Sequence, residues 1–251
     1  MEREALVRWL DRFLDLPAFA DDPSLNGLQV EGSDEVQKVA VAVDASLMAI
    51  EQAADAGADM LITHHGLFWG APLAIRGPHK RRVEALLDAD ISLYAAHLPL
   101  DAHQEVGNNW GLARLLGLDA LAPFGDWRGR SIGVQGVYPT PVSLRDLADQ
   151  LERTLGESVL VHAGGPMEVT RLGIVSGSAS GMIADAAAAG LDSFLSGEPK
   201  HDNFHAPYEH GINALYAGHY MTETVGVKLL ADRLRAEHDL VTEFLLLPTG
   251  L

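Results

Sequence analysis

Short apolar segments alternate with helical patterns through the first half of the chain, and this alternation constrains the fold more than any other feature. The predicted strands cover 36–44, 58–63 and 91–96, and the predicted helices cover 46–56, 79–88 and 108–116. Strands that alternate with helices of this length are typical of a parallel sheet with helices on its faces. We therefore expect an α/β fold, in which ligands gather beyond the carboxyl ends of the strands.

The second half of the chain repeats the pattern. Strands are predicted near 131–138, 158–161, 169–176, 191–195, 213–217 and 240–247, and the main helices cover 143–155, 181–189 and 222–235. Residues 41–63 can be placed over 174–196 without a gap. An internal repeat of this kind predicts two similar lobes. The alternative is that the match is incidental, because any two segments with alternating strands and helices look alike.

A shorter repeat involves residues that carry chemistry. The segment from Leu93 to Asp101 matches the segment from Leu215 to Glu223, so that His97 aligns with His219 and one acid aligns with the other. If a helix begins near His219, the four-residue spacing puts the imidazole and the carboxylate of Glu223 on one helical face. The alternative is an ordinary capped helix with an acid in its first turn.

Five side chains at predicted strand ends form a candidate metal site. They are His64, His65, Asp101, His219 and Glu223. Three imidazoles and two carboxylates suit a pair of divalent ions, which would share a hydroxide nucleophile. A single His-His pair is usually incidental, whereas five converging ligands are a stronger indication. The chain has no cysteine, so any metal must be bound by His, Asp or Glu.

We expect the fold to be two similar three-layer α/β/α lobes with the metal site in the cleft between them. The first lobe is predicted over residues 1–125, with 225–251 packing back on it, and the second over 126–224. The net charge of −17 argues against nucleic acid or an anionic membrane as a partner. No signal peptide and no apolar run of about 20 residues is found, which predicts a cytoplasmic protein.

Several ordered motifs of the chain resemble those of the YbgI / Nif-three-like dinuclear metal-binding family, whose members are often labelled GTP cyclohydrolase type 2 homologues. The motifs are Asn26-Gly27-Leu28-Gln29-Val30, Thr63-His64-His65-Gly66, His97-Leu98-Pro99-Leu100-Asp101, Gly107-Asn108-Asn109, Ser196-Gly197-Glu198 and Gly218-His219-Tyr220 with Thr222-Glu223. The resemblance covers nearly the whole chain. The family's usual Thr after the histidine of the third motif is Leu98 in this chain.

The resemblance implies a two-lobed α/β/α fold that binds two divalent ions through the same five ligands. It also implies a homo-oligomer, since bacterial relatives look like toroidal hexamers built as trimers of dimers. The nitrogen and oxygen ligands fit zinc, iron, manganese, cobalt or nickel almost equally well.

Four further residues near the expected site have two or more interpretations each. His97 either binds a metal or orients Asp101, and the resemblance favours the supporting role. Glu198 is a candidate general base, a hydrogen-bonding partner of the ligands, or a solvated acid in a turn. Phe68 and Trp69 either stack on a planar ligand or fill a gap between the lobes. We expect His97 and Glu198 to be the residues that assist catalysis.

The function expected from the sequence is metal-dependent hydrolysis of a small molecule through a metal-bridged hydroxide. GTP cyclohydrolase activity is one candidate, although no guanine pocket can be identified in the sequence. The alternatives are a protein that handles or delivers metals such as iron, and an interaction protein without turnover. The substrate itself cannot be derived from the sequence.

Overall fold

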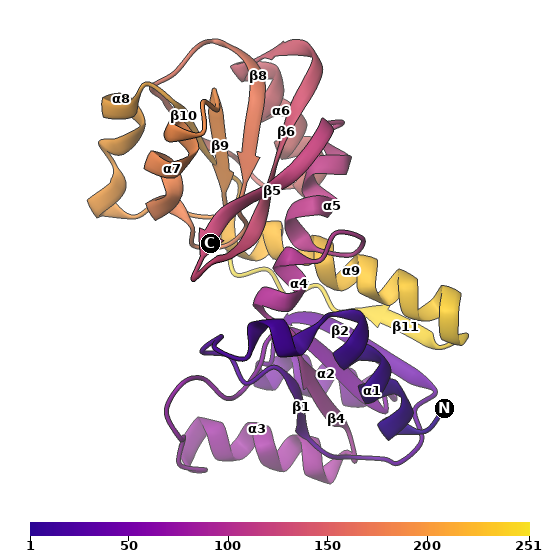
Figure 1. The fold of residues 1–251 in the computed structure, drawn as a ribbon. Coiled ribbons are helices and arrows are strands. Elements are labelled where there is room, and N and C mark those ends of the chain that lie inside the picture. Colours follow the sequence, from indigo (N-terminus) through magenta and orange to yellow (C-terminus); the bar gives the residue numbers. More distant parts are fainter. The chain divides into compact units, whose positions relative to one another are not determined.

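The computed structural model describes residues 1–251 and shows an α/β protein with two mixed sheets, as expected (Figure 1). Contacts divide the chain into two compact units. The first unit contains Met1–Leu100 and Gly226–Leu247, and the second contains Asp101–Val225 and Pro248–Leu251. The lobe boundaries given above stay a prediction.

The first unit is built on a five-stranded sheet with the order β1-β4-β3-β2-β11. Its strands are β1 (Gly27–Val30), β2 (Lys38–Asp44), β3 (Met60–His65), β4 (Ser92–Ala95) and β11 (Val241–Phe244). The pairs within β4-β3-β2-β11 are parallel, and β1 is antiparallel to β4. Residues Val39–Val43 of β2 are buried on both faces of the strand, which is typical of a parallel strand covered by helices on both sides.

Helices cover both faces of this sheet. They are α1 (Arg3–Phe13), α2 (Leu47–Asp55), α3 (Gly77–Asp88) and the later part of α9 (His219–His238). The short helix α4 (Leu98–Ala102) follows β4. Leu93 of β4 packs with residues of α2 and α3, whereas the hydroxyl of the next residue, Tyr94, donates to Asp11 of α1. Neighbouring strand residues point to opposite faces, so α1 lies on the other side of the sheet from α2 and α3. The first unit therefore has three layers.

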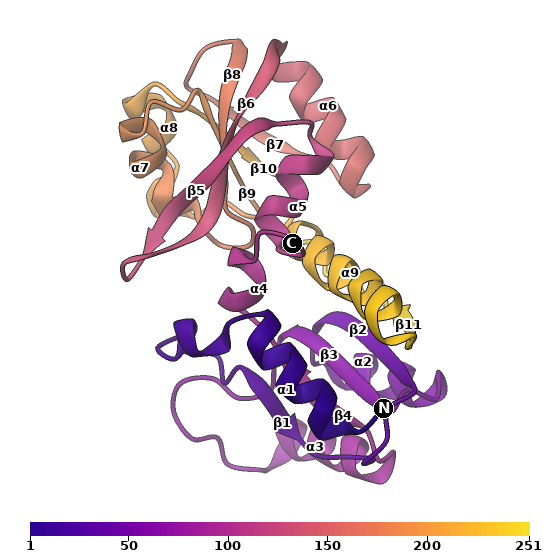
Figure 2. The same ribbon diagram turned by 45° about the vertical axis from the view of Figure 1, so that its right-hand side comes forward.

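The second unit contains a six-stranded sheet with the order β5-β6-β8-β9-β10-β7. Its strands are β5 (Asp119–Trp127), β6 (Arg130–Ser143), β7 (Leu160–Ala163), β8 (Glu168–Ile174), β9 (Ser193–Ser196) and β10 (Asn213–Tyr216). The helices α7 (Ile183–Ala188) and α8 (Ala206–His210) lie on one face, and α5 (Asn108–Leu115) and α6 (Leu144–Leu155) lie on the other (Figure 2). Ser143 caps α6 by accepting a hydrogen bond from the Asp146 amide.

The two sheets share one topology. In the first unit, β2, β3 and β4 are parallel neighbours and β1 adds antiparallel to β4. In the second unit, β8, β9 and β10 are parallel neighbours and β7 adds antiparallel to β10. Both sets of four strands follow each other in the same chain order. The similarity of the two halves predicted from the sequence is therefore present in the strand connections.

The structure differs from the sequence prediction at two strands. Strand β1 is not among the predicted strands, and it is a four-residue edge strand that begins at Gly27, whose φ is +101°. Strand β5 lies across the residues 123–126, where the second half was expected to begin. It forms a hairpin with β6 through Arg128 and Gly129, which both have positive φ, as a two-residue hairpin turn requires. Pro123 is tolerated because β5 is an edge strand.

None of the helices combines the length and the apolar character required for crossing a lipid bilayer.

Candidate metal centre

Three histidines meet at one edge of the first unit's sheet. Strand β3 ends with His64 and His65, and His97 follows the neighbouring parallel strand β4. Their ring centroids are separated by 4.7 Å (His64–His65), 5.1 Å (His64–His97) and 5.7 Å (His65–His97). One ring nitrogen of each histidine lies within 4.8 Å of those of the other two. The carboxyl ends of adjacent parallel strands thus gather three imidazoles, as their positions in the sequence predict.

Each of the three rings is oriented through its Nδ1 atom. His64 Nδ1 is 3.0 Å from the Ala96 carbonyl oxygen, His65 Nδ1 is 2.9 Å from Asp44 Oδ1, and His97 Nδ1 is 3.0 Å from Asp22 Oδ1. Carbonyl and carboxylate oxygens accept, so each Nδ1–H donates, and a neutral ring in this tautomer has its lone pair on Nε2. Histidine ligands of metals are usually held in this way, which fixes the tautomer and the direction of the ring.

Asp22 holds the turn that carries His97. Its carboxylate accepts hydrogen bonds from the Ser24 amide at 3.0 Å, the Asn26 side chain at 2.9 Å and the Leu98 amide at 3.1 Å, in addition to His97. Burial by itself raises the pKa of Asp22, but the hydrogen bonds, that from His97 foremost, outweigh burial and hold this pKa below its usual value. The carboxylate is therefore ionised, and its acceptor positions are used within the unit.

The second unit contains a histidine between two carboxylates. Helix α9 begins at His219, so His219 and Glu223 lie on one helical face, as one of the two sequence alternatives requires. His219 Nε2 is 3.2 Å from Glu223 Oε1, and His219 Nδ1 is 3.3 Å from Glu198 Oε1. The hydrogen bond with Glu223 raises the pKa of His219 to about 9, against the opposing effect of burial, and Glu198 adds to the increase. A metal ion that binds His219 must displace this proton.

Two glycines allow the backbone to approach this pair. Gly177 has a φ of +63°, and a Cβ atom at this position would collide with the carboxylate of Glu223. A Cβ atom at Gly197 would lie 2.6 Å from the Cα atom of His219. The cradle around His219 and Glu223 therefore requires glycine at both positions.

Asp101 is buried in the second unit and is held by neighbouring side chains. Its Oδ1 atom accepts hydrogen bonds from Asn108 Nδ2 and from Ser176 Oγ, both at 2.9 Å. Asn109 donates to the Ile132 carbonyl oxygen at 2.8 Å and accepts from the Ser176 amide at 2.7 Å. Asn108 and Asn109 stand at the start of the helix predicted over 108–116, and both are fully buried and hold the segment around Asp101.

Each unit brings several of the predicted residues together. His64, His65 and His97 form one group in the first unit, and Glu198, His219 and Glu223 form another in the second unit. Asp101 belongs to the second unit. That the ligands of both units bind the same pair of ions stays a prediction. The Nδ1 atom of His103, two residues after Asp101, accepts from the amides of Glu105 and Val106 and so stabilises a turn.

The available donors fit a divalent transition metal. Imidazole nitrogens with fixed tautomers and buried carboxylates suit zinc, iron, manganese, cobalt or nickel.

Sequence reasoning missed Asp22, Asp44 and Ser176, which orient His97, His65 and Asp101. The only local signal for them is that Asp44 and Ser176 stand at the ends of predicted strands, where polar residues follow apolar runs.

Comparisons with known proteins cover nearly the whole chain. Residues 1–248 match the model of the family described as Duf34/NIF3 (NGG1p interacting factor 3). A protein of Deinococcus radiodurans named "GTP cyclohydrolase 1 type 2 homolog" is 53% identical over 99% of this chain and 94% of its own length. The crystal structure of TTHA1606 from Thermus thermophilus is 50% identical and covers 100% of both chains with a TM-score of 0.94. The structure of ybgI, described as of unknown function, is 37% identical and covers 100% of both chains with a TM-score of 0.92.

Proposed function

The chain belongs to the Duf34/NIF3 family, and from this premise we propose that it is a metal-dependent hydrolase with a dinuclear centre. The observation that carries the proposal is the histidine group of the first unit, in which each Nδ1 atom donates to an oxygen acceptor. Three imidazoles oriented in this way are costly to collect at one edge of a sheet unless they bind a cation. Two divalent ions would supply an activated water and stabilise charge on the attacked group.

The proposed ligands are those expected from the sequence. His64 and His65 bind from the first unit, and Asp101, His219 and Glu223 bind from the second. Asp44 keeps His65 in the tautomer that binds through Nε2, and Asn108 with Ser176 fixes the Asp101 carboxylate. These supporting bonds pre-orient the ligands, so that little side-chain entropy is lost when the ions bind.

His97 and Glu198 have supporting or proton-transferring roles in this proposal. His97 is held by Asp22 and lies beside His64 and His65, where the lone pair of its Nε2 atom would accept a proton from the attacking water. Glu198 forms an ion pair with His219 Nδ1, which favours orientation of the ligand over action as a general base. Of the interpretations of Glu198, its geometry thus supports the hydrogen-bonding partner.

The substrate is proposed as a small molecule with a polarised carbon or phosphorus centre. The names of the relatives suggest GTP cyclohydrolase activity. The second candidate is metal handling, a function without turnover. The observation that favours it is the proton between His219 and Glu223, which makes metal affinity sensitive to pH. Assembly into a ring-shaped hexamer stays a prediction, which light scattering after gel filtration would test.

One experiment tests the hydrolase proposal. Metal-loaded protein is incubated with GTP, a phosphodiester and a cyclic amide, and the products are followed by chromatography. We expect turnover of at least one class, and loss of that turnover in Glu223→Gln with an unchanged elution volume in gel filtration. If none of the three classes is hydrolysed while ions exchange freely, the hydrolase proposal is wrong and metal handling is favoured.

A further inference from the structure

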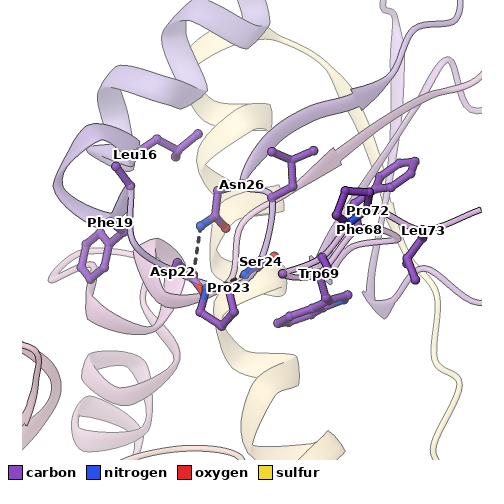
Figure 3. Close-up of a pocket in the computed structure, with 14 residues that line it drawn as sticks. Leu16, Phe19, Asp22, Pro23, Ser24, Asn26, Phe68, Trp69, Pro72 and Leu73 are labelled. Carbon is purple, nitrogen blue, oxygen red and sulfur yellow. Dashed lines mark hydrogen bonds between the residues drawn. The ribbon is translucent and has the colours of Figure 1, made fainter.

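A pocket of about 500 Å³ opens within the first unit (Figure 3). One wall is the segment that contains Phe19 and Asp22, and the other is the segment after β3 that contains Phe68, Trp69 and Pro72. Figure 3 shows Phe19 on one side and Phe68, Trp69 and Pro72 on the other, with Asp22 and Ser24 between them. This volume is typical of sites for small molecules.

The two walls are joined by backbone hydrogen bonds. The Leu25 amide donates to the Phe68 carbonyl oxygen at 3.0 Å, and the Gly70 amide donates to the Pro23 carbonyl oxygen at 2.6 Å. Ser24 and Trp69 form an antiparallel bridge. The pocket is therefore preformed, which lowers the entropic cost of binding a ligand.

The pocket borders the histidine group. The ring of Trp69 lies edge-on to His97 with 5.0 Å between centroids, and 5.8 Å from His65. Asp22, which lines the pocket, forms the hydrogen bond that orients His97. A molecule bound against Trp69 would thus be adjacent to two of the three imidazoles.

The pocket wall offers aromatic faces and few polar groups. The Asp22 carboxylate accepts from Ser24, Asn26, His97 and Leu98, and the Asn26 side-chain oxygen accepts from the His97 amide. In contrast, the Ser24 hydroxyl is buried without a hydrogen-bond partner, and Ser24 is only 4% exposed. Because this hydroxyl is covered by protein, the surface that the wall offers to a ligand is mainly aromatic.

We propose that this pocket binds a planar heteroaromatic ring of the substrate, between Trp69 and the opposite wall. The inference rests on the proposed function, since it places the ring beside the histidines that serve the reaction. Recognition of guanine over adenine requires an acceptor for the guanine N1–H and amino groups. The carboxylate of Asp22 is already used by the protein, so the pocket selects a ring shape and does not discriminate between purines.

Ligand-observed NMR on the metal-free, full-length protein tests this inference. The probes are guanosine and adenosine, with ribose as the control for the sugar. We expect both nucleosides to bind with affinities within about threefold of each other and ribose not to bind. Trp69→Leu should weaken nucleoside binding about tenfold, because stacking of one base on an aromatic ring is worth about 1–3 kcal/mol.

Further variants separate the effect of the aromatic ring from other effects on nucleoside binding. Trp69→Phe retains an aromatic face and should bind nucleosides within a few-fold of the wild type. Ser24→Ala removes a hydroxyl that is covered by protein, so it should also bind nucleosides as the wild type does. Trp127→Leu, in the second unit, is the matched control and should bind as the wild type does. Nucleosides that bind no better than ribose, or that bind Trp69→Leu as well as the wild type, overturn the inference. Because metal is absent, these results are independent of whether the metal-loaded protein hydrolyses any compound.

Discussion

The Nε2 atom of His219 lies 3.2 Å from Oε1 of Glu223, four residues further along helix α9. The Glu223 side chain is only 4% exposed, so its charge is stabilised mainly by groups of the protein. In the metal-free protein a proton of His219 supplies that stabilisation, and in the metal-bound protein a cation would replace it. Proton and metal therefore compete for the same pair of residues.

This competition predicts a pH dependence of stability. The pKa of His219 is raised to about 9 in the folded protein, above the value of about 6.5 of an unfolded chain. The ion pair therefore stabilises the metal-free protein fully below about pH 6.5, and its contribution is lost as pH rises through about 9. We expect a loss of about 1–2 kcal/mol across this range after allowance for solvent screening. Urea unfolding at a series of pH values measures it.

The control for this pH effect is His219→Gln in the same buffers. This variant should show a smaller change of unfolding free energy between pH 6 and pH 9. If wild type and variant lose stability in parallel, the pair does not carry the effect. With metal bound, the dependence should reverse, because metal affinity increases as His219 loses its proton.

Asp44→Asn tests the support of His65. The amide cannot fix the tautomer as the carboxylate does, so we expect metal affinity to fall about 10- to 100-fold with a small change in stability. Isothermal titration with zinc measures the affinity. Asp55→Asn, an exposed acid on α2, is the matched control and should bind zinc normally. Equal affinities for Asp44→Asn and the control would refute the role of Asp44.

Ser176→Ala tests the support of Asp101. The variant removes the hydroxyl that donates to Asp101 Oδ1 at 2.9 Å. We expect about tenfold weaker metal binding and a stability loss of about 1 kcal/mol. Ser143→Ala is the control, because it removes a helix cap and should cost about 1 kcal/mol without changing metal affinity. Unchanged metal affinity in both variants would mean that Ser176 contributes to the stability of the fold and not to metal binding.

Gly177→Ala tests the glycine cradle. The added Cβ would collide with Glu223 and would also sit at a positive φ. Gly156→Ala has a positive φ of +78° but no atom within 4 Å of its Cβ, so it measures the backbone cost alone, about 1 kcal/mol. We expect Gly177→Ala to lose at least about 2 kcal/mol more than Gly156→Ala in urea unfolding. Similar losses in the two variants would show that the site tolerates a side chain.

Features with short sequence spacing could be predicted from the sequence. His64 and His65 end an apolar strand, and Glu223 follows His219 by one helical turn, so periodicity alone places them. The parallel strands that carry these residues were predicted for the same reason. The edge strands β1 and β5 were not predicted, since β1 has only four residues and the turn at Arg128-Gly129 lacks the common Asn-Gly or Asp-Gly signal.

The supporting residues could not be predicted, because their partners are distant in the sequence. Asp22 is 75 residues before His97, and Ser176 is 75 residues after Asp101. No local pattern reports such contacts. Asn108 and Asn109 were noticed, but their position at the start of a helix has a local explanation that conceals their contacts with Asp101 and Ser176.

The central claim is that ligands from both units bind one pair of ions. Anomalous diffraction at the metal absorption edge, from crystals of the metal-loaded protein, tests this claim most directly. We predict two peaks about 3.5–4 Å apart, with His64, His65, Asp101, His219 and Glu223 as ligands. A single peak bound by His64, His65 and His97 alone, or no peak within reach of these side chains, would contradict the account.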